Sequence, residues 1–214
     1  MYKAVGLLVF ILLCFSINYA NANGRIETES TDNRPIKTTT VNTSLEQLNN
    51  LTSLPLANGS FEQRKYFTVL KQPIVSTGEV YLDQSLGFVW QTQHPISSVL
   101  RLKKSGLFMQ DEVSPEREVK GAATITQVLM NALSGNVDAL QNEFSFAPSI
   151  KNNCIRLLPK ENLLTNVMQA IDLCMVDNKL NGIVLFEHSG NRTEIDITLS
   201  ALTKLPEAIS AQLQ

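Results

Sequence analysis

The stretch FEQRKYFTVLKQPIVSTGEVYLDQSLGFVW, residues 61–90, decides the fold class of this chain. Polar and apolar residues alternate along it, which is typical of strands that turn one face toward a core and the other toward solvent. Pro73 and the segment 84–87 interrupt the alternation. The pattern predicts strands at 61–70, 76–83 and 87–92, joined by short turns into an antiparallel meander.

The remainder of the chain continues the same pattern, with a turn at Asn58-Gly59 leading into the sheet. Further strands are predicted at 97–103, 107–111, 153–158, 168–176, 183–188 and 192–199, with hairpin turns at 177–182 and 189–191. Helical spacing and capping signals predict helices at 44–53, at 122–133 before Gly135, from Asn136 to Phe144, and from Pro206 onward. About nine strands cannot stay flat, because their twist accumulates. We therefore expect an α+β fold over residues 44–200, with a strongly curved antiparallel sheet whose concave side the helices cover, and a helical tail at 201–214.

The first 22 residues have the composition of a signal peptide. Lys3 provides a positive charge, residues 4–17 form an uncharged apolar run, and Ala20-Asn21-Ala22 supplies a cleavage pattern. The apolar run is shorter than the roughly 20 residues that a spanning helix needs, so a retained membrane anchor is the weaker alternative. The sequence predicts an exported protein that begins near Asn23, with a flexible polar lead-in at 23–43.

The charged and nucleophilic residues show no catalytic arrangement. The formal net charge of −2 is spread along the chain and provides no basic stripe, which argues against a nucleic-acid partner. The chain has two histidines, His94 and His188, and both fall beside predicted turns, where exposed side chains are the ordinary interpretation. Neither a G-x-S-x-G turn nor an H-E-x-x-H helix is present. We expect a protein that is not an enzyme and that has no cofactor and no bound metal.

Cys154 and Cys174 lie in predicted strands that are neighbours in sequence. If Ile155 and Leu173 face the core, both cysteines point to the opposite face. This parity permits a disulfide across the two strands but does not fix their register. The alternatives are a disulfide and two half-buried free thiols.

Several short motifs resemble the LolA-like periplasmic lipoprotein carriers when they are taken in order. They are F-x-Q at Phe61 and Gln63, Gly78 twelve residues before Trp90 with Phe88 between them, L-x-P-K at 157–160, Asn181-Gly182-Ile183, and the closing hairpin at 189–195. The resemblance covers about residues 44–200. It implies an unclosed β-barrel, covered by helices, with an apolar cavity that shields acyl chains in the periplasm of a Gram-negative bacterium.

The resemblance also implies binding residues and partners. The expected cavity wall consists of Val80, Leu82, Phe88, Trp90, Leu100 and Leu102. The expected partners are the acyl chains of a lipoprotein or other lipid, an inner-membrane exporter as donor and an outer-membrane acceptor, with the protein itself a monomer. The alternating residues would equally suit a solid core, so the cavity is an expectation of the resemblance and not of the pattern.

One position departs from the family pattern. The family's cargo-handling Arg-Pro pair is replaced here by Gln84-Ser85, and no basic residue follows before Arg101. This leaves the cargo open between lipoproteins and other envelope lipids. Two alternatives remain: a lipid- or protein-sensing module in envelope stress signalling, and an envelope hydrolase whose triad would be assembled only in space.

Overall fold

The computed structural model describes residues 52–119, 123–160, 165–166 and 168–214. The predicted signal peptide, the lead-in and all but the last residues of the helix predicted at 44–53 lie outside these ranges. Within them, no helix has both the length and the apolar composition that crossing a membrane requires.

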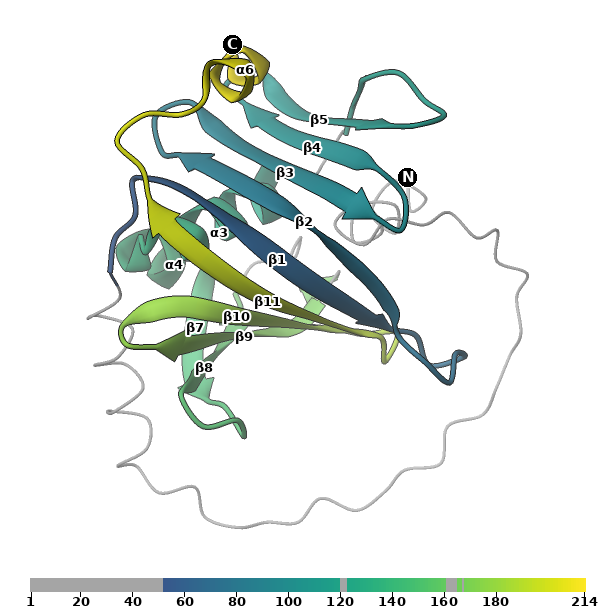
Figure 1. Ribbon diagram of the computed structural model, residues 1–214. Coiled ribbons are helices and arrows are strands. Elements are labelled where there is room, and N and C mark those ends of the chain that lie inside the picture. The colour runs from purple at the N-terminus through teal and green to yellow at the C-terminus, as the bar shows by residue number, and fades with distance from the viewer. Residues whose placement is uncertain (1–51, 120–122, 161–164, 167) are drawn as a thin grey trace, which may run out of the picture.

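One antiparallel sheet contains all the described strands. Its eleven strands follow the order β6-β5-β4-β3-β2-β1-β11-β10-β9-β8-β7. The strands are β1 (Leu56–Tyr66), β2 (Ile74–Asp83), β3 (Gly87–His94), β4 (Ser98–Lys103), β5 (Gly106–Asp111), β6 (Arg117–Glu118), β7 (Phe144–Pro148), β8 (Cys154–Pro159), β9 (Met168–Val176), β10 (Lys179–Glu187) and β11 (Arg192–Ala201). The sheet curls strongly, but its edge strands β6 and β7 do not pair (Figure 1). The predicted fold class, an unclosed half-barrel with short helices, is confirmed.

The sheet consists of two meanders that meet at its centre. Strands β1–β6 form one and β7–β11 form the other, and the antiparallel pairing of β1 with β11 joins them. This pairing runs from Ala57 opposite Ala201 to Tyr66 opposite Arg192. Residues from the two ends of the described chain therefore share the middle of the concave face.

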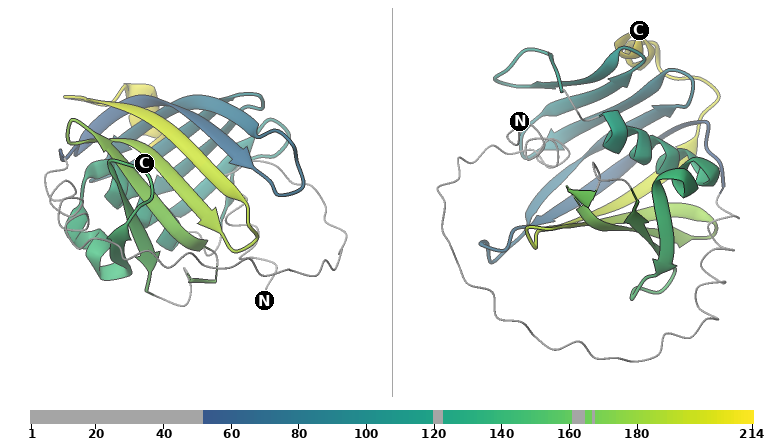
Figure 2. Two further views of the ribbon diagram at one scale, coloured as in Figure 1. Left: turned by 90° about the horizontal axis from the view of Figure 1, so that it is seen from below. Right: turned by 180° about the vertical axis from the view of Figure 1, so that it is seen from behind.

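The helices α3 (Ala123–Ser134) and α4 (Val137–Glu143) cover the concave face of the sheet (Figure 2). Gly135 follows α3 with φ of 72°, and the Asn136 side chain caps α4 by accepting a hydrogen bond of 3.3 Å from the Ala139 N–H. The predicted helices at 122–133 and 136–144, and the stop at Gly135, are confirmed to within a residue.

Buried apolar side chains form two separate clusters, one on each side of the sheet. The larger cluster fills the concave side, between the sheet and α3 and α4. The smaller one lies on the convex side, where Val89 of β3 contacts Leu205, Ile209 and Leu213 of the C-terminal segment. That segment forms α6 (Glu207–Ser210), which follows Pro206 as predicted, and the 3-10 helix η1 (Ala211–Leu213). The end of the chain is thus packed against β3 and β4.

The sequence misplaced several boundaries. The turn expected at Asn58-Gly59 is wrong, because both residues lie inside β1, which starts at Leu56 and ends at Tyr66. A Cβ atom at Gly59 would lie 1.9 Å from the Thr198 carbonyl oxygen, so this glycine permits close strand pairing and does not mark a turn.

The strand count was also too low, since β6 and β7 were missed. Strand β6 has only two residues, too few for a periodic signal. Strand β7 contains Pro148, which an edge strand tolerates because one side of its backbone has no partner strand. The turn expected at 177–182 is shorter than predicted: Asp177 and Asn178 have positive φ, and β10 begins at Lys179.

Candidate functional site

The six predicted wall residues lie together on the concave face. Their register forms two rows across β2, β3 and β4, each with one residue from each strand. The rows are Val80–Trp90–Leu100 and Leu82–Phe88–Leu102. Every one of these side chains belongs to or packs against the larger apolar cluster, and Phe88 and Val80 are fully buried. The structure therefore brings the six residues into one continuous apolar surface.

Phe61 extends this surface across β2 to the centre of the sheet. Its ring stacks on the Trp90 ring with centroids 4.0 Å apart. Phe61 lies opposite Gly78, which has no side chain to separate the two rings. The sequence identified Phe61 only through the F-x-Q motif, and the alternation within β1 was the signal that could have placed it in the wall.

The helices complete the apolar surface from the other side. Val128, Met130 and Ala132 of α3 and Leu140 of α4 are buried in the same cluster as Phe88. The site therefore lies between a curved sheet and two short helices.

The concave face becomes polar at the end where β1 finishes and β11 begins. Gln63 and Lys65 continue the inward alternation after Phe61, and Thr193 lies directly opposite Lys65. Lys65 forms a buried ion pair with Glu187 of β10. Burial lowers the pKa of the Lys65 ammonium, and the hydrogen bond and charge of Glu187 oppose that shift. Sequence reasoning missed this group, although β1 parity alone puts two of its members on the inner face.

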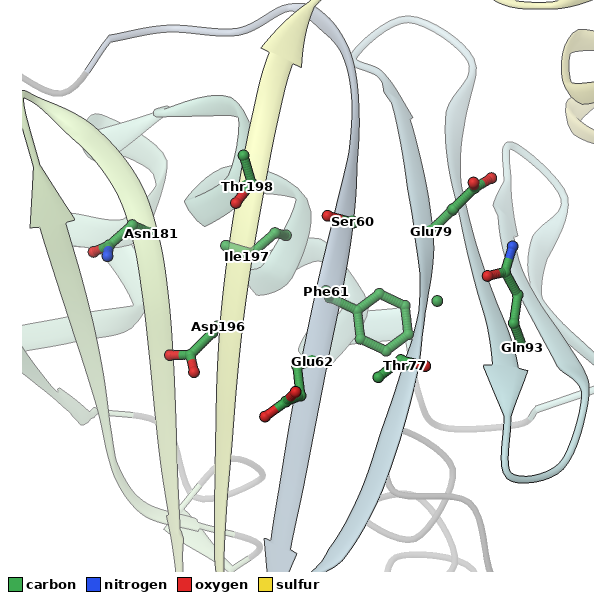
Figure 3. Close-up of a pocket in the computed structure, with 11 residues that line it drawn as sticks. Ser60, Phe61, Glu62, Thr77, Glu79, Gln93, Asn181, Asp196, Ile197 and Thr198 are labelled. Atoms are coloured by element: carbon green, nitrogen blue, oxygen red, sulfur yellow. The ribbon is translucent and has the colours of Figure 1, made fainter.

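A pocket with a volume of about 560 Å³ lies on the opposite face of the sheet, across β2, β1, β11 and β10 (Figure 3). Its lining includes the carboxylates of Glu62, Glu79 and Asp196. Arg64 forms ion pairs with Glu62 and Asp196. Phe61 also contributes to the lining of this pocket, but none of the six predicted wall residues does, so the pocket does not correspond to the predicted site.

Gln84 and Ser85 occupy the turn between β2 and β3. The Gln84 N–H donates to the Pro55 carbonyl at 2.9 Å, and its side-chain amide lies 3.4 Å from the Ser134 carbonyl at the end of α3. Ser85 instead bonds to the Asp83 carboxylate through its hydroxyl and N–H. The residue at the family's arginine position thus links this turn to the end of a covering helix.

Cys154 and Cys174 form a disulfide and lie directly opposite each other on β8 and β9, with Cα atoms 4.0 Å apart. They alternate with inward-facing Ile155 and Leu173, so the disulfide is on the convex face. Of the two alternatives that the sequence left open, a disulfide and two free thiols, the disulfide is the one that forms.

The two histidines lie at the ends of strands. His94 is exposed at the end of β3, and His188 follows β10, with its Nε2 2.6 Å from the Thr165 carbonyl oxygen. Over the described ranges, no group of three or more histidine, cysteine or carboxylate side chains is arranged to hold a metal ion.

None of the curated proteins matches the chain. A LolA superfamily protein from Nitrosomonas europaea is 12% identical and aligns over 79% of this chain and 96% of its own, with a TM-score of 0.46. An outer membrane lipoprotein-sorting protein domain from Vibrio parahaemolyticus is 8% identical and aligns over 80% of this chain and 96% of its own, with a TM-score of 0.45. A chain in the structure of the Pseudomonas aeruginosa MucA/MucB complex is 10% identical and aligns over 80% of this chain and 62% of its own, with a TM-score of 0.41.

The match to a family model covers every strand of the described sheet. The family model for the outer membrane lipoprotein carrier protein LolA matches residues 53–208, from the segment before β1 to α6. This range contains both meanders and the covering helices. The chain therefore belongs to the LolA family.

Proposed function

We propose that this protein is a non-enzymatic periplasmic carrier that shields the acyl chains of a lipoprotein or another envelope lipid during transfer toward the outer membrane. The observation that carries the proposal is the continuous apolar surface on the concave face of a LolA-family sheet, built from Phe61, the rows of β2–β4 and the helices α3 and α4. The donor would be an inner-membrane exporter and the acceptor a component of the outer membrane.

The energetics of lipid transfer require such a surface. Each methylene kept from water is worth roughly 0.8 kcal/mol, so a chain of about 15 methylenes needs shelter worth about 12 kcal/mol. An acyl chain of this length would lie between the sheet and the covering helices and would separate contacts that now bury Phe88. Release then returns those contacts to the protein, which offsets part of the cost of losing the lipid.

The composition of the concave cluster suits repeated opening. Apart from Met1, every methionine of the chain lies buried in it: Met109, Met130, Met168 and Met175. Methionine is unbranched and flexible, so it fills irregular space and adapts when neighbours move. A wall that contains flexible side chains from β5, α3 and β9 can repack around an acyl chain or without one.

The chain's single tryptophan gives a direct test of binding. Trp90 is buried in the proposed wall, so an acyl ligand that enters should change its emission. Titration with a dodecanoyl lipid should give a saturable change. The variant Leu102→Gln should weaken binding at least about tenfold, because it places an amide against the acyl chain. The neighbouring Arg101→Gln is the control, since Arg101 lies on the convex face and bonds to Gln212.

Two further measurements separate carriage from sensing. Native mass spectrometry of protein purified from its own envelope should detect a co-purified lipid, and labelled lipid should move from the protein to acceptor vesicles. Binding without transfer would favour the sensing module. The absence of both a Trp90 response and a co-purified lipid would contradict the proposal.

A further inference from the structure

The polar end of the concave face is a group of buried side chains that the proposed acyl site does not use. It comprises Gln63, Lys65, Ser76, Glu187 and Thr193, and none of these residues, counted with its backbone, is more than 9% exposed. Gln63 lies opposite Ser76, and Lys65 lies opposite Thr193, so β2, β1 and β11 place these side chains side by side. Along β1 they directly follow Phe61, the last residue of that strand in the apolar surface.

Two atoms of this group have no hydrogen-bond partner among the described residues: Oε1 of Gln63 and Oγ1 of Thr193. The two residues are 4% and 1% exposed, so bulk water does not supply the missing bonds. Buried polar atoms without partners are rare in folded proteins because each costs the free energy of its lost hydration. Two of them on one face, at the end of an apolar surface, indicate a place where a ligand completes the hydrogen bonding.

A buried carboxylate elsewhere in the sheet, outside the polar end, has all its hydrogen bonds made within the protein. Asp172 is fully buried on β9, and its carboxylate accepts two bonds from Arg156, at 2.7 and 2.9 Å, and one from Ser149 at 2.7 Å. This cluster is on the convex side, away from the apolar surface. The sheet thus completes the hydrogen bonding of a buried carboxylate outside the polar end. The third buried side-chain atom without a hydrogen bond among the described residues, Nε of Arg192, lies 3.0 Å from the Glu194 carboxylate in an ion pair.

The charges at the polar end decide against an anionic ligand. The Lys65 ammonium already pairs with Glu187, whose other oxygen accepts from Ser189 at 3.0 Å and Asn191 at 3.4 Å. A fatty-acid carboxylate would have to compete with Glu187 for Lys65, and the net charge of the pair is zero. A neutral polar group meets no such competition.

The two atoms without hydrogen-bond partners instead match the donor and the acceptor of an amide group. The Gln63 Oε1 atom accepts a hydrogen bond and therefore needs an N–H or O–H donor. The Thr193 hydroxyl can donate to a carbonyl oxygen. An acyl amide offers one N–H and one carbonyl oxygen, whereas an acyl ester has no donor. We infer that the polar end binds the amide group of an N-acyl lipid while the acyl chain lies along the apolar surface beyond Phe61; this rests on the proposed carrier function.

A matched pair of ligands tests the inference. N-methyldodecanamide and methyl dodecanoate have the same acyl chain. They differ only in that the amide has an N–H group where the ester has an oxygen atom. Titrations followed by Trp90 emission should show about tenfold tighter binding of the amide. Thr193→Val and Gln63→Met should each bring the ratio close to one. Thr198→Val is the control, because Thr198 is on the same strand with its side chain on the convex face, and it should leave the ratio unchanged.

Stability provides a second readout that does not depend on a ligand. If the hydroxyl of Thr193 lacks a partner, Thr193→Val should leave the midpoint of urea unfolding unchanged or raise it, and Gln63→Met should behave likewise. A lower midpoint for both variants would show that these polar groups are part of the folded structure and would overturn the inference.

The binding outcomes separate this inference from the proposed function. Equal affinity for amide and ester, unaffected by the variants, would overturn the amide site and leave the carrier function standing. If neither ligand bound, the amide site and the acyl site would both be overturned.

Discussion

Replacing Lys65 by methionine removes the cation of the buried ion pair while keeping most of the side-chain volume. The Lys65 side chain is 3% exposed and that of Glu187 is 10% exposed, so the single variant leaves an uncompensated carboxylate in a buried position. Breaking a buried pair in this way costs about 3–5 kcal/mol. Glu187 keeps its bonds from Ser189 and Asn191, which places the expected loss near the lower limit, at about 3 kcal/mol.

The double variant Lys65→Met/Glu187→Leu removes both charges and should recover most of that loss. Replacing a buried pair by apolar side chains is often neutral or stabilising, so we expect its free energy of unfolding within about 1 kcal/mol of the wild type. Arg64→Met is the matched control, since Arg64 is the adjacent residue on the opposite face. Its ion pairs with the exposed carboxylates of Glu62 and Asp196 should together contribute no more than about 1 kcal/mol.

Urea unfolding followed by Trp90 emission measures all four proteins. A loss below about 1 kcal/mol for Lys65→Met would refute the claim that the pair is buried. A double variant as unstable as the single one would refute the claim that an isolated charge causes the loss.

The same pair gives a pH dependence whose sign follows from the pKa of Lys65. Because burial lowers that pKa below its ordinary value of 10.5, the folded protein releases this proton at a lower pH than the unfolded chain. Between the lowered pKa and 10.5, the unfolded chain binds more protons, so the contribution of Lys65 to stability rises with pH. The wild type should therefore gain stability relative to the double variant through this window in urea unfolding at successive pH values. A loss of stability of the wild type relative to the double variant over this pH window would contradict a lowered pKa of Lys65.

Two further substitutions test the geometry of the sheet. Gly78→Ala should destabilise the protein by about 3 kcal/mol or more, because its Cβ would lie 2.0 Å from the Gln91 carbonyl oxygen. Gly182→Ala should cost about 1 kcal/mol or less, because the atom nearest to its Cβ would be a side-chain carbon at 3.3 Å. Equal losses in urea unfolding would refute the close approach at Gly78. Replacing Cys154 and Cys174 by serine should cost about 3 kcal/mol, as expected for a loop between residues separated by 20 positions. Acyl-lipid affinity should be unchanged, since the disulfide is on the convex face; a parallel loss of binding would contradict that placement.

Alternation in the sequence predicted much of the fold because it is a local property. A period of two assigns each side chain to a face whatever the partner strand is. This is why Phe88 and Trp90 were assigned to one face of their strand, and Leu100 and Leu102 to one face of theirs, before any register was known. The family resemblance placed all four in one wall. The covering helices were predictable for the same reason, since Gly135 and Asn136 act on the helix ends beside them.

Contacts between distant strands were not predictable in this way. The position of Gly59 illustrates the difference: glycine next to asparagine is a turn signal locally, yet the neighbouring β11 backbone requires a residue without a side chain there. The edge strand β7 was missed because its proline argues against a strand, and only its place at the end of the sheet makes that proline acceptable.

The sequence by itself determined that this chain forms a curved antiparallel sheet with an apolar inner face, and its motifs indicated the LolA family. Parity with Phe61 also puts Gln63 and Lys65 on that inner face, although sequence reasoning did not single them out. Only the tertiary structure brought Glu187 and Thr193 to them, across 122 residues in the case of the Lys65–Glu187 pair. The physical reason is that parity selects a face, whereas the pairing of β1 with β11 selects the neighbours, and hydrogen bonding at the polar end depends on those neighbours.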